Sequence, residues 1–334
     1  MTKKSESNML KNTILAASAN GLKTASGSPP LRHFIELTDW SGAEIESLLK
    51  DALRMKKDAL KGKHKAVLQG RMLGMIFEKP SLRTRVSFQA AMSHLGGQSI
   101  FLTQHEVGFG TRESLPDVAR TISQFVDVLV LRVFEHRTVE EFAKWATVPV
   151  INALSDVAHP CQALGDLLTI REHFGDLAGR TLTFVGDGNN VARSLALACA
   201  KVGIKFILSA PKGYGFDQAF RTQFAAAADA NLLAEASSPG DAVREADIVY
   251  TDVWTSMGQE AETAERMRRF KNFCVDSALM AAAPKDAIFM HCLPAHRGEE
   301  TTDEVMESPQ SVVFEQAGNR LHSQKALLRW MLDA

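Results

Sequence analysis

Apolar residues along the chain form short continuous runs that alternate with longer stretches of helical spacing. The first runs, typical of buried strands, cover 71–77, 99–103, 128–134 and 148–153. A second set covers 181–186, 205–210, 247–253, 287–292 and 311–314. Strands separated by helices imply right-handed crossovers and parallel pairing. The pattern therefore predicts an α/β protein with two doubly wound domains, each with a mainly parallel central sheet flanked by helices.

Between these runs, capping signals and apolar stripes predict the helices. Ser41 and Glu44 have capping-box spacing before an apolar stripe, and 85–97 has helical spacing that ends in two glycines. Ser114 is expected to cap the next helix, and Thr138 begins another. A long helix is expected at 160–174, and the polar segment 104–113 is expected to be a loop.

The pattern also gives domain boundaries. Residues 1–30 are rich in Ser, Ala, Asn and Lys and end in a Gly-Ser-Pro-Pro linker, so they predict a disordered extension. This segment contains no arginine, which disfavours a mitochondrial transit peptide, although a targeting role stays an alternative. The first domain is expected at 31–158, completed by a C-terminal helix at 318–334. The second is expected at 159–317.

Composition excludes several functional classes. The 334 residues carry a formal net charge of -1, so neither nucleic acid nor an anionic membrane is expected as a partner. No apolar run approaches the roughly 18 residues of a membrane span. The four cysteines are far apart and show no C-x-x-C pair, which predicts reduced thiols in the cytoplasm and no structural metal.

The segment FEKPSLRTRVSF, 77–88, predicts an anion site. It places Ser81, Leu82, Arg83 and Thr84 at a turn between a strand and a helix. Free N–H groups and the helix dipole attract phosphate at such a turn, and arginine adds charge-assisted hydrogen bonds. The alternative is a solvated helix start whose arginines pair with surface carboxylates.

Three further strand ends carry candidate chemistry. Arg132 follows Val and Leu residues, where a charge requires a partner, so a structural ion pair is the alternative to a binding role. His159 precedes the long helix, and a capping or core histidine is the alternative there. The turn 186–190 suggests a dinucleotide site, but Val191 replaces the third glycine of that motif and no acidic residue follows the next strand. No cofactor is therefore expected.

Two of these segments resemble the carbamoyl-phosphate motifs of the aspartate and ornithine carbamoyltransferases: FEKPSLRTRVSF and HPCQALGDLLT, 159–169. The resemblance implies that 31–158 binds carbamoyl phosphate, that Arg132 and His159 polarise the carbamoyl oxygen, and that Gln162 holds the carbamoyl amide. The implied contacts to carbamoyl phosphate are Ser81, Leu82, Arg83, Thr84, Arg132, His159, Pro160, Gln162, Cys292, Leu293 and Arg320.

Three segments resemble the ornithine branch of that family: GDGNN at 186–190, DVWTSMGQE at 252–260 and HCLPAHRGE at 291–299. They imply that 159–317 binds ornithine, and they give Asn190, Asp252, Ser256 and Met257 as its contacts. Cys292 then orients the ornithine amine and joins Arg132 and His159 as a catalytic residue. Aspartate enzymes have P-L-P in place of Cys292-Leu293-Pro294.

The resemblance implies transfer of a carbamoyl group from carbamoyl phosphate to the δ-amino group of L-ornithine, giving citrulline and phosphate. It also implies that the protein is a homotrimer. Acetylornithine and putrescine are alternative acceptors, and a non-enzymatic carbamoyl-phosphate binder is a more distant alternative. The direction, arginine synthesis or breakdown, is left open. Relatives place Gln or His in the loop after the third strand, where it reaches a neighbouring subunit. Gly108 stands there instead, and Gln104 and His105 are the candidates to replace it.

Overall fold

The computed structural model describes residues 31–256 and 259–332. The predicted extension 1–30, Met257 and the last two residues of the predicted C-terminal helix lie outside the described residues. Within the described ranges, no helix is long and apolar enough to cross a membrane.

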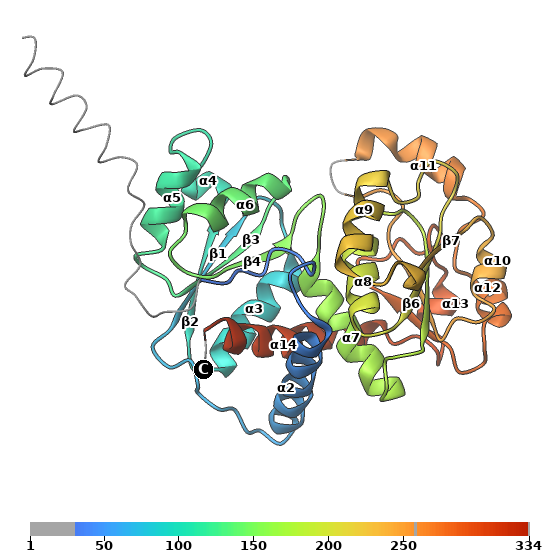
Figure 1. The fold of residues 1–334 in the computed structure, drawn as a ribbon, viewed down its shortest axis with the longest axis horizontal. Helices are drawn as coiled ribbons and strands as arrows, with labels where there is room; N and C mark the ends of the chain where they lie inside the picture. Colours follow the sequence, from blue (N-terminus) through green and yellow to red (C-terminus); the bar gives the residue numbers. More distant parts are fainter. Residues whose placement is uncertain (1–30, 257–258, 333–334) are drawn as a thin grey trace, which may run out of the picture. The chain divides into compact units, whose positions relative to one another are not determined.

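The first sheet contains four parallel strands in the order β2-β1-β3-β4 (Figure 1). Their bounds are β1 Met72–Phe77, β2 Gln98–Thr103, β3 Val128–Arg132 and β4 Val150–Leu154. Alternate side chains of β1 and β3 face two apolar clusters, because successive residues of a strand point to opposite faces. One cluster includes α5 (Leu115–Ile122) and α6 (His136–Trp145), and the other includes α3 (Leu82–His94).

The second sheet contains five parallel strands in the order β7-β6-β5-β8-β9. The strands are β5 Thr181–Val185, β6 Lys205–Ser209, β7 Leu233–Ala236, β8 Ile248–Thr251 and β9 Ile288–His291. The helical elements around them are α8 Asn190–Lys201, α9 Gln218–Ala227, η1 Ala230–Leu232, α10 Pro239–Ala242, η2 Glu260–Glu262, α11 Thr263–Phe270, α12 Ser277–Ala282 and α13 Asp303–Met306. The prediction of two parallel sheets flanked by helices is confirmed.

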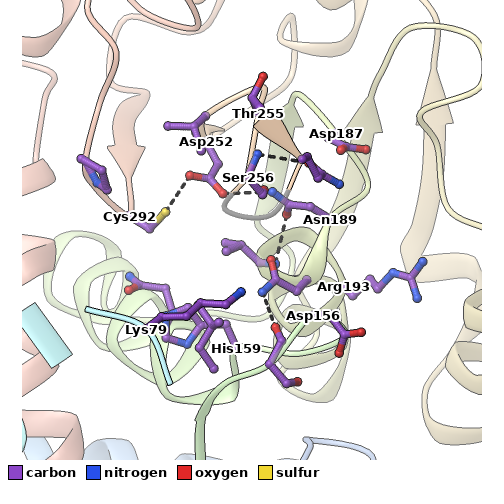
Figure 2. A pocket seen from close by; sticks show the side chains of 18 of the residues that line it. Lys79, Asp156, His159, Asp187, Asn189, Arg193, Asp252, Thr255, Ser256 and Cys292 are labelled. Carbon is purple, nitrogen blue, oxygen red and sulfur yellow. Dashed lines mark hydrogen bonds between the residues drawn. The ribbon is translucent and has the colours of Figure 1, made fainter. Parts of the chain in front are cut away.

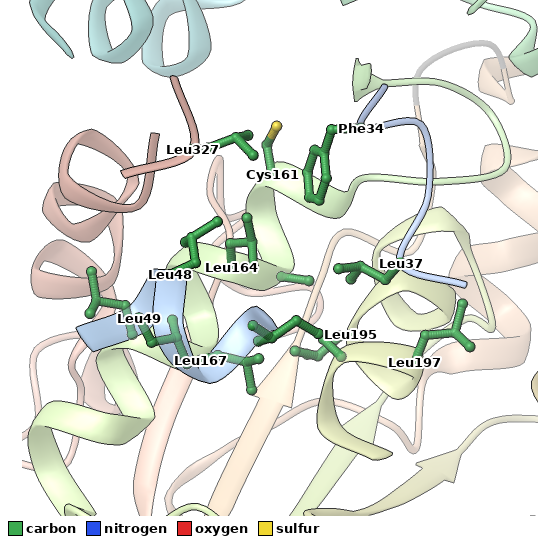
Figure 3. Close-up of a cluster of buried hydrophobic side chains, with 14 of the residues drawn as sticks. Phe34, Leu37, Leu48, Leu49, Cys161, Leu164, Leu167, Leu195, Leu197 and Leu327 are labelled. Carbon is green, nitrogen blue, oxygen red and sulfur yellow. The ribbon is translucent and has the colours of Figure 1, made fainter. Parts of the chain in front are cut away.

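Three helices complete the largest core cluster: α2 (Gly42–Leu60), α7 (Pro160–Phe174) and α14 (Val313–Met331). Helix α14 packs against α7, α2 and α3 (Figure 1). Helix α7 is buried on all sides from Pro160 to Ile170, including its polar residues. Figure 3 shows leucines from four helices meeting in this cluster: Leu48, Leu49, Leu164, Leu167, Leu195, Leu197 and Leu327.

Three local predictions are wrong, and one strand was missed. The apolar run 311–314 forms no strand: Ser311 makes an isolated bridge to Phe289, and α14 begins at Val313. The short strand β7 was not predicted. A one-turn helix, α4 (Gln104–Val107), occupies the predicted polar loop because Thr103 and Glu106 form a capping box. Helix α6 begins at His136 rather than Thr138.

Both sheets reverse their strand order at one point. In the first sheet β1 lies between β2 and β3, and in the second β5 lies between β6 and β8. Loops that leave neighbouring strands on opposite faces diverge there and open a crevice at the carboxyl ends. The segments after β1, β3, β5 and β8 are therefore placed to build a binding site.

Candidate active site

One cleft of ≈ 1470 Å³ collects the segments that leave these switch points. Its lining includes Lys79–Thr84 after β1, Arg132 at the end of β3, Asp187–Val191 after β5 and Asp252 after β8. Cys292 and Leu293, after β9, and Arg320, from α14, also line it. Every predicted site residue that the structure describes lies in this cleft, except Pro160, which begins α7 beside it.

Three arginines gather in the part of the cleft formed by the first sheet and α14. Arg132 is 7% exposed and Arg320 is 2% exposed, and Arg83 lines the same wall. None of the three forms an ion pair with a residue that the structure describes. Burial, Arg320 and Arg83 lower the pKa of Arg132 to about 10. The alternative of a structural ion pair for Arg132 is therefore not observed, and this arginine corner (Arg83, Arg132 and Arg320) favours an anionic ligand.

The start of α3 adds polar groups to the arginine corner. Ser81 is the residue before the helix, and its hydroxyl makes no capping hydrogen bond. Thr84 is buried and accepts a hydrogen bond of 3.3 Å from Arg320 Nη2. Unpaired N–H groups at the first turn of a helix add positive potential. The predicted anion turn thus lies beside the arginines.

The buried carboxylate of Asp166 fixes the arginine corner through Gln162, which contacts Arg320. Arg320 Nη1 donates to Gln162 Oε1, and Gln162 Nε2 donates to Asp166 Oδ1 at 2.8 Å. Asp166 also accepts from Gln316 Nε2 at 2.8 Å and Tyr250 Oη at 3.2 Å. Burial raises the pKa of Asp166 to about 6. Because both polar ends of Gln162 are held, its position is fixed by α7 and α14 together.

His159 lies at the base of the cleft and is 6% exposed. Its backbone N–H donates to Ser194 Oγ at 2.8 Å, whereas its Nδ1 has no hydrogen-bond partner among the described residues. Burial, Arg320, Arg132 and Arg83 hold the pKa of His159 well below its ordinary value. The imidazole is therefore neutral near pH 7, and it offers hydrogen bonding rather than charge.

The opposite wall of the cleft carries a carboxylate and a thiol. Cys292 Sγ donates to Asp252 Oδ1 at 3.0 Å, and Asn189 Nδ2 donates to Asp252 Oδ2 at 3.0 Å (Figure 2). Asp252 is 6% exposed and follows β8. Burial, followed by Asp252, raises the pKa of Cys292 well above its ordinary value. The thiol is thus protonated near neutrality, and Asp252 supplies the negative charge of this wall.

Asn189 was not among the predicted residues, although it has two structural roles. Its Oδ1 accepts from the backbone N–H groups of Val191 and Ala192, both at 3.0 Å, and so caps α8. Its Nδ2 fixes Asp252. An asparagine before a helix is a capping signal in sequence, but nothing local reveals its contact with a residue 63 positions away.

The other residues expected to contact ornithine, where the structure describes them, lie on the same wall as Asp252. Asn190 Nδ2 donates to the carbonyl oxygen of Ser155 at 2.6 Å and joins the turn after β5 to the segment after β4. The backbone N–H of Ser256 donates to Gln259 Oε1 at 3.1 Å. Leu293 has a left-handed φ of 57°, a conformation found at ligand-binding positions more often than elsewhere. Met257 belongs to the part of the chain outside the described ranges.

Ligand atoms of Asp252, His291 and Cys292 lie within 4.8 Å of one another, the spacing of a metal site. Both nitrogens of His291 are already engaged. Its Nδ1 accepts from the backbone N–H of Leu293 at 2.9 Å, and its Nε2 lies 3.0 Å from Glu300. These bonds orient the Cys292-Leu293 turn and leave His291 without a free ligand atom for a metal.

Gly108, where relatives were expected to present Gln or His, ends α4 with a left-handed φ of 70°. A side chain is disfavoured in that conformation, which explains the glycine. Gln104 and His105 lie on α4, and neither lines the cleft of this chain.

Two sequence profiles match nearly the whole described chain. The "Aspartate/ornithine carbamoyltransferase, carbamoyl-P binding domain" matches residues 32–172, and the "Aspartate/ornithine carbamoyltransferase, Asp/Orn binding domain" matches 178–331. The chain belongs to the aspartate/ornithine carbamoyltransferase family. An ornithine carbamoyltransferase of Pyrococcus furiosus named as anabolic is 48% identical over 89% of this chain and 95% of its own length.

Solved structures of this carbamoyltransferase family agree with the fold. The ornithine carbamoyltransferase structure from Pyrococcus furiosus has a TM-score of 0.86 and 47% identity, covering 90% of this chain and 96% of that one. An acetylornithine transcarbamylase complexed with acetylcitrulline has a TM-score of 0.82 and 30% identity, covering 90% of this chain and 99% of its own. The fold is shared by both kinds of enzyme, whereas the sequence is more similar to the ornithine enzyme.

Proposed function

We propose that the chain is an ornithine carbamoyltransferase, which transfers the carbamoyl group of carbamoyl phosphate to the δ-amino group of L-ornithine in arginine biosynthesis. The observation that carries this proposal is the division of one cleft into two walls of opposite charge. The arginine corner suits carbamoyl phosphate, and the wall of Asp252 suits an ammonium group. Two substrates held face to face react at an effectively raised concentration.

Carbamoyl phosphate binds with its phosphate at the start of α3, where Ser81, Arg83 and the N–H groups of Leu82 and Thr84 lie. Its carbamoyl oxygen faces Arg132 and His159, and its amide faces Gln162, the Pro160 segment, Cys292 and Leu293. Arg320 approaches from α14. The absence of ion pairs between these arginines and the described carboxylates supports this assignment.

Ornithine binds the opposite wall through Asn190, Asp252 and Ser256, and Met257, the fourth expected contact, lies outside the described residues. Asp252 pairs with the α-ammonium group, and Cys292 orients the δ-amine. The neutral δ-amine attacks the carbonyl carbon, negative charge develops on the carbonyl oxygen, and the bond to phosphate breaks. Arg132 and neutral His159 stabilise this oxygen, as preorganised donors do in other acyl transfers. The attacking amine gives up one proton to the departing phosphate, and citrulline and hydrogen phosphate leave.

The acetylornithine alternative fits Asp252 poorly. Acetylation removes the positive charge of the α-amine, so a buried carboxylate would lack its charge partner. The higher identity to the ornithine enzyme supports the same choice.

Citrulline formation from carbamoyl phosphate tests the proposal. Ornithine, acetylornithine, putrescine and aspartate are assayed side by side with the same enzyme. We expect ornithine to have a kcat/KM at least about 100-fold above the others, because each alternative leaves a buried polar group unpaired. Preference for acetylornithine or putrescine would make the chain a sister enzyme, and no turnover with any acceptor would favour a non-enzymatic binder.

We also propose a homotrimer, supported by exposed apolar residues near the arginine corner. Leu82 is 75% exposed and Val86 54% exposed on α3, and Ile100 is 41% exposed on the edge strand β2, which packs against α3. Exposed apolar groups beside an edge strand suit burial against another subunit.

The four free cysteines support a cytoplasmic location. We assign 31–158 with 318–334 to carbamoyl phosphate and 159–317 to ornithine.

Activity at subsaturating ornithine should rise with pH through the alkaline range. The δ-amine has a reference pKa of about 10.4, so its reactive neutral form is scarce near pH 7. Burial, followed by Asp252, raises the pKa of Cys292, so this thiol contributes no titration near neutral pH. Cys292→Ser is expected to retain the alkaline rise and to raise the ornithine KM by roughly three- to tenfold, because serine keeps a donor to Asp252.

A covalent thiol mechanism predicts a different outcome. Cys292→Ser would be inactive at every pH, and wild-type enzyme quenched with carbamoyl phosphate alone would carry a carbamoyl adduct. Intact-mass measurement of that sample distinguishes the mechanisms, and Cys274→Ser, a half-buried thiol outside the cleft, is the control.

A further inference from the structure

A second pocket, of ≈ 160 Å³, lies outside the catalytic cleft and shares none of its lining residues. It is lined by residues of α2 and α14, by Leu95 at the end of α3, and by the segment 63–67. Five of its lining residues are cationic and one is acidic: Arg54, Lys63, Lys65, Lys325, Arg329 and Asp58. We define these residues as the basic pocket.

Lys325 is the unusual member of the basic pocket. It is only 3% exposed, and it makes no hydrogen bond or ion pair with the described part of the chain. Lysine side chains are seldom buried to this extent, and Lys325 lines the pocket. Burial lowers the pKa of Lys325, while the charge of Asp58 opposes that shift.

Few described carboxylates lie beside the basic pocket. Asp51 lies 2.8 Å from Arg54 and 2.6 Å from Arg329, so it is shared between the two guanidinium groups. Lys63 and Lys65 are exposed at the mouth. His94 and His322 lie near Lys325, and burial, with a smaller contribution from Lys325, lowers the pKa of both. The groups around Lys325 are thus mainly basic.

We propose that the basic pocket binds a small phosphate-bearing polyanion, with Lys325 as its buried charge partner and Lys63 and Lys65 at its mouth. The volume of ≈ 160 Å³ is below the roughly 300–1,000 Å³ typical of drug-sized ligands, which favours an ion of about the size of pyrophosphate. Among the described contacts, Arg54 bonds Asp51 through one nitrogen only, and its other N–H groups suit phosphate oxygens. The site is separate from the carbamoyl-phosphate corner, and its ligand is no substrate of the reaction.

Calorimetric titration with inorganic pyrophosphate tests the proposal. Pyrophosphate also resembles carbamoyl phosphate, so the titration is repeated with saturating carbamoyl phosphate to occupy the catalytic cleft. We expect wild-type enzyme to retain about one pyrophosphate site per chain under that condition. Lys325→Met should weaken this site about 30-fold or more, as removal of one buried charge partner does.

Variants at the mouth keep the test decisive if Lys325→Met folds poorly. Lys63→Gln with Lys65→Gln changes exposed side chains only and should weaken the site roughly two- to fivefold. Lys61→Gln is the matched control, since it lies in the same exposed segment but does not line the pocket. The proposal is overturned if wild-type enzyme shows no site insensitive to carbamoyl phosphate, or if the Lys63 and Lys65 variant binds like the Lys61 control.

Discussion

Replacing Arg132 with alanine is expected to lower kcat for citrulline formation by about 10²- to 10³-fold. This is the typical loss when one donor to a developing oxyanion is removed. Arg132 ends β3 at the switch point of the first sheet, and its Nε has no hydrogen-bond partner among the described residues. The side chain lines the cleft and donates no hydrogen bond to a described residue, so its terminal N–H groups are available to a ligand.

The same geometry predicts that Arg132→Ala folds. Since Arg132 forms no ion pair with the described residues, its removal leaves no buried carboxylate behind. It also relieves repulsion from Arg320 and Arg83, which together with burial lowers its pKa. Thermal unfolding should show a Tm within a few degrees of wild type, while steady-state kinetics show the loss of turnover.

Arg71→Ala is the matched control for Arg132→Ala. Arg71 lies just before β1, where it pairs with Asp127 at 2.7 Å on an exposed surface. An exposed pair contributes little, so this variant should retain turnover within about twofold. Near-normal turnover by folded Arg132→Ala would instead assign Arg132 a structural role.

Most of the fold could be predicted from apolar runs because strands of a parallel sheet are buried on both faces. All five residues of β3 are buried, for example, and its run of Val and Leu is unmistakable. The missed strand β7 has no fully buried residue, so its sequence lacks that signal. The run 311–314 is apolar like a strand, but only Ser311 pairs with the sheet, in an isolated bridge to Phe289. The chain then enters α14 at Val313.

The candidate site was predicted as a set of residues, whereas its supporting contacts were not. Turn chemistry identified Arg83, the charge at a strand end identified Arg132, and the resemblance to the ornithine branch gave Asp252. Asp166 was missed because it lies within a helix, and its partners Tyr250 and Gln316 are 84 and 150 residues away. Such contacts depend on how α7, α14 and the second sheet pack, and no local pattern encodes that.

The two walls of the cleft differ in how they hold their charge. The arginine corner has three cations, and no carboxylate of the described ranges pairs with them, so an anion gains from all of them. Asp252 is held by Cys292 and Asn189, two neutral groups that fix its position without cancelling its charge. A cationic ligand at Asp252 therefore does not compete with a described cation, and the two ligands can be weakened separately.

Asp252→Asn is expected to raise the ornithine KM about 30-fold or more while carbamoyl-phosphate affinity changes by only a few fold. Loss of one partner from a buried charge pair costs 2–5 kcal/mol or more, which corresponds to that range. The amide keeps the shape of the side chain and can still bond Asn189 or Cys292, so the wall should retain its structure. Initial rates at varied ornithine, with direct titration of carbamoyl phosphate, separate the two effects.

Asp156→Asn provides the matched control for Asp252→Asn, because it makes the same change in the same cleft. Asp156 accepts from the backbone N–H of His136 at 2.8 Å and is exposed, so water can replace its charge interactions. Its variant should bind ornithine within about twofold of wild type. Arg83→Ala should show the reverse selectivity of Asp252→Asn, weakening carbamoyl phosphate and sparing ornithine. If Asp252→Asn weakens both ligands equally, Asp252 organises the cleft as a whole, and the assignment of ornithine to its wall is wrong.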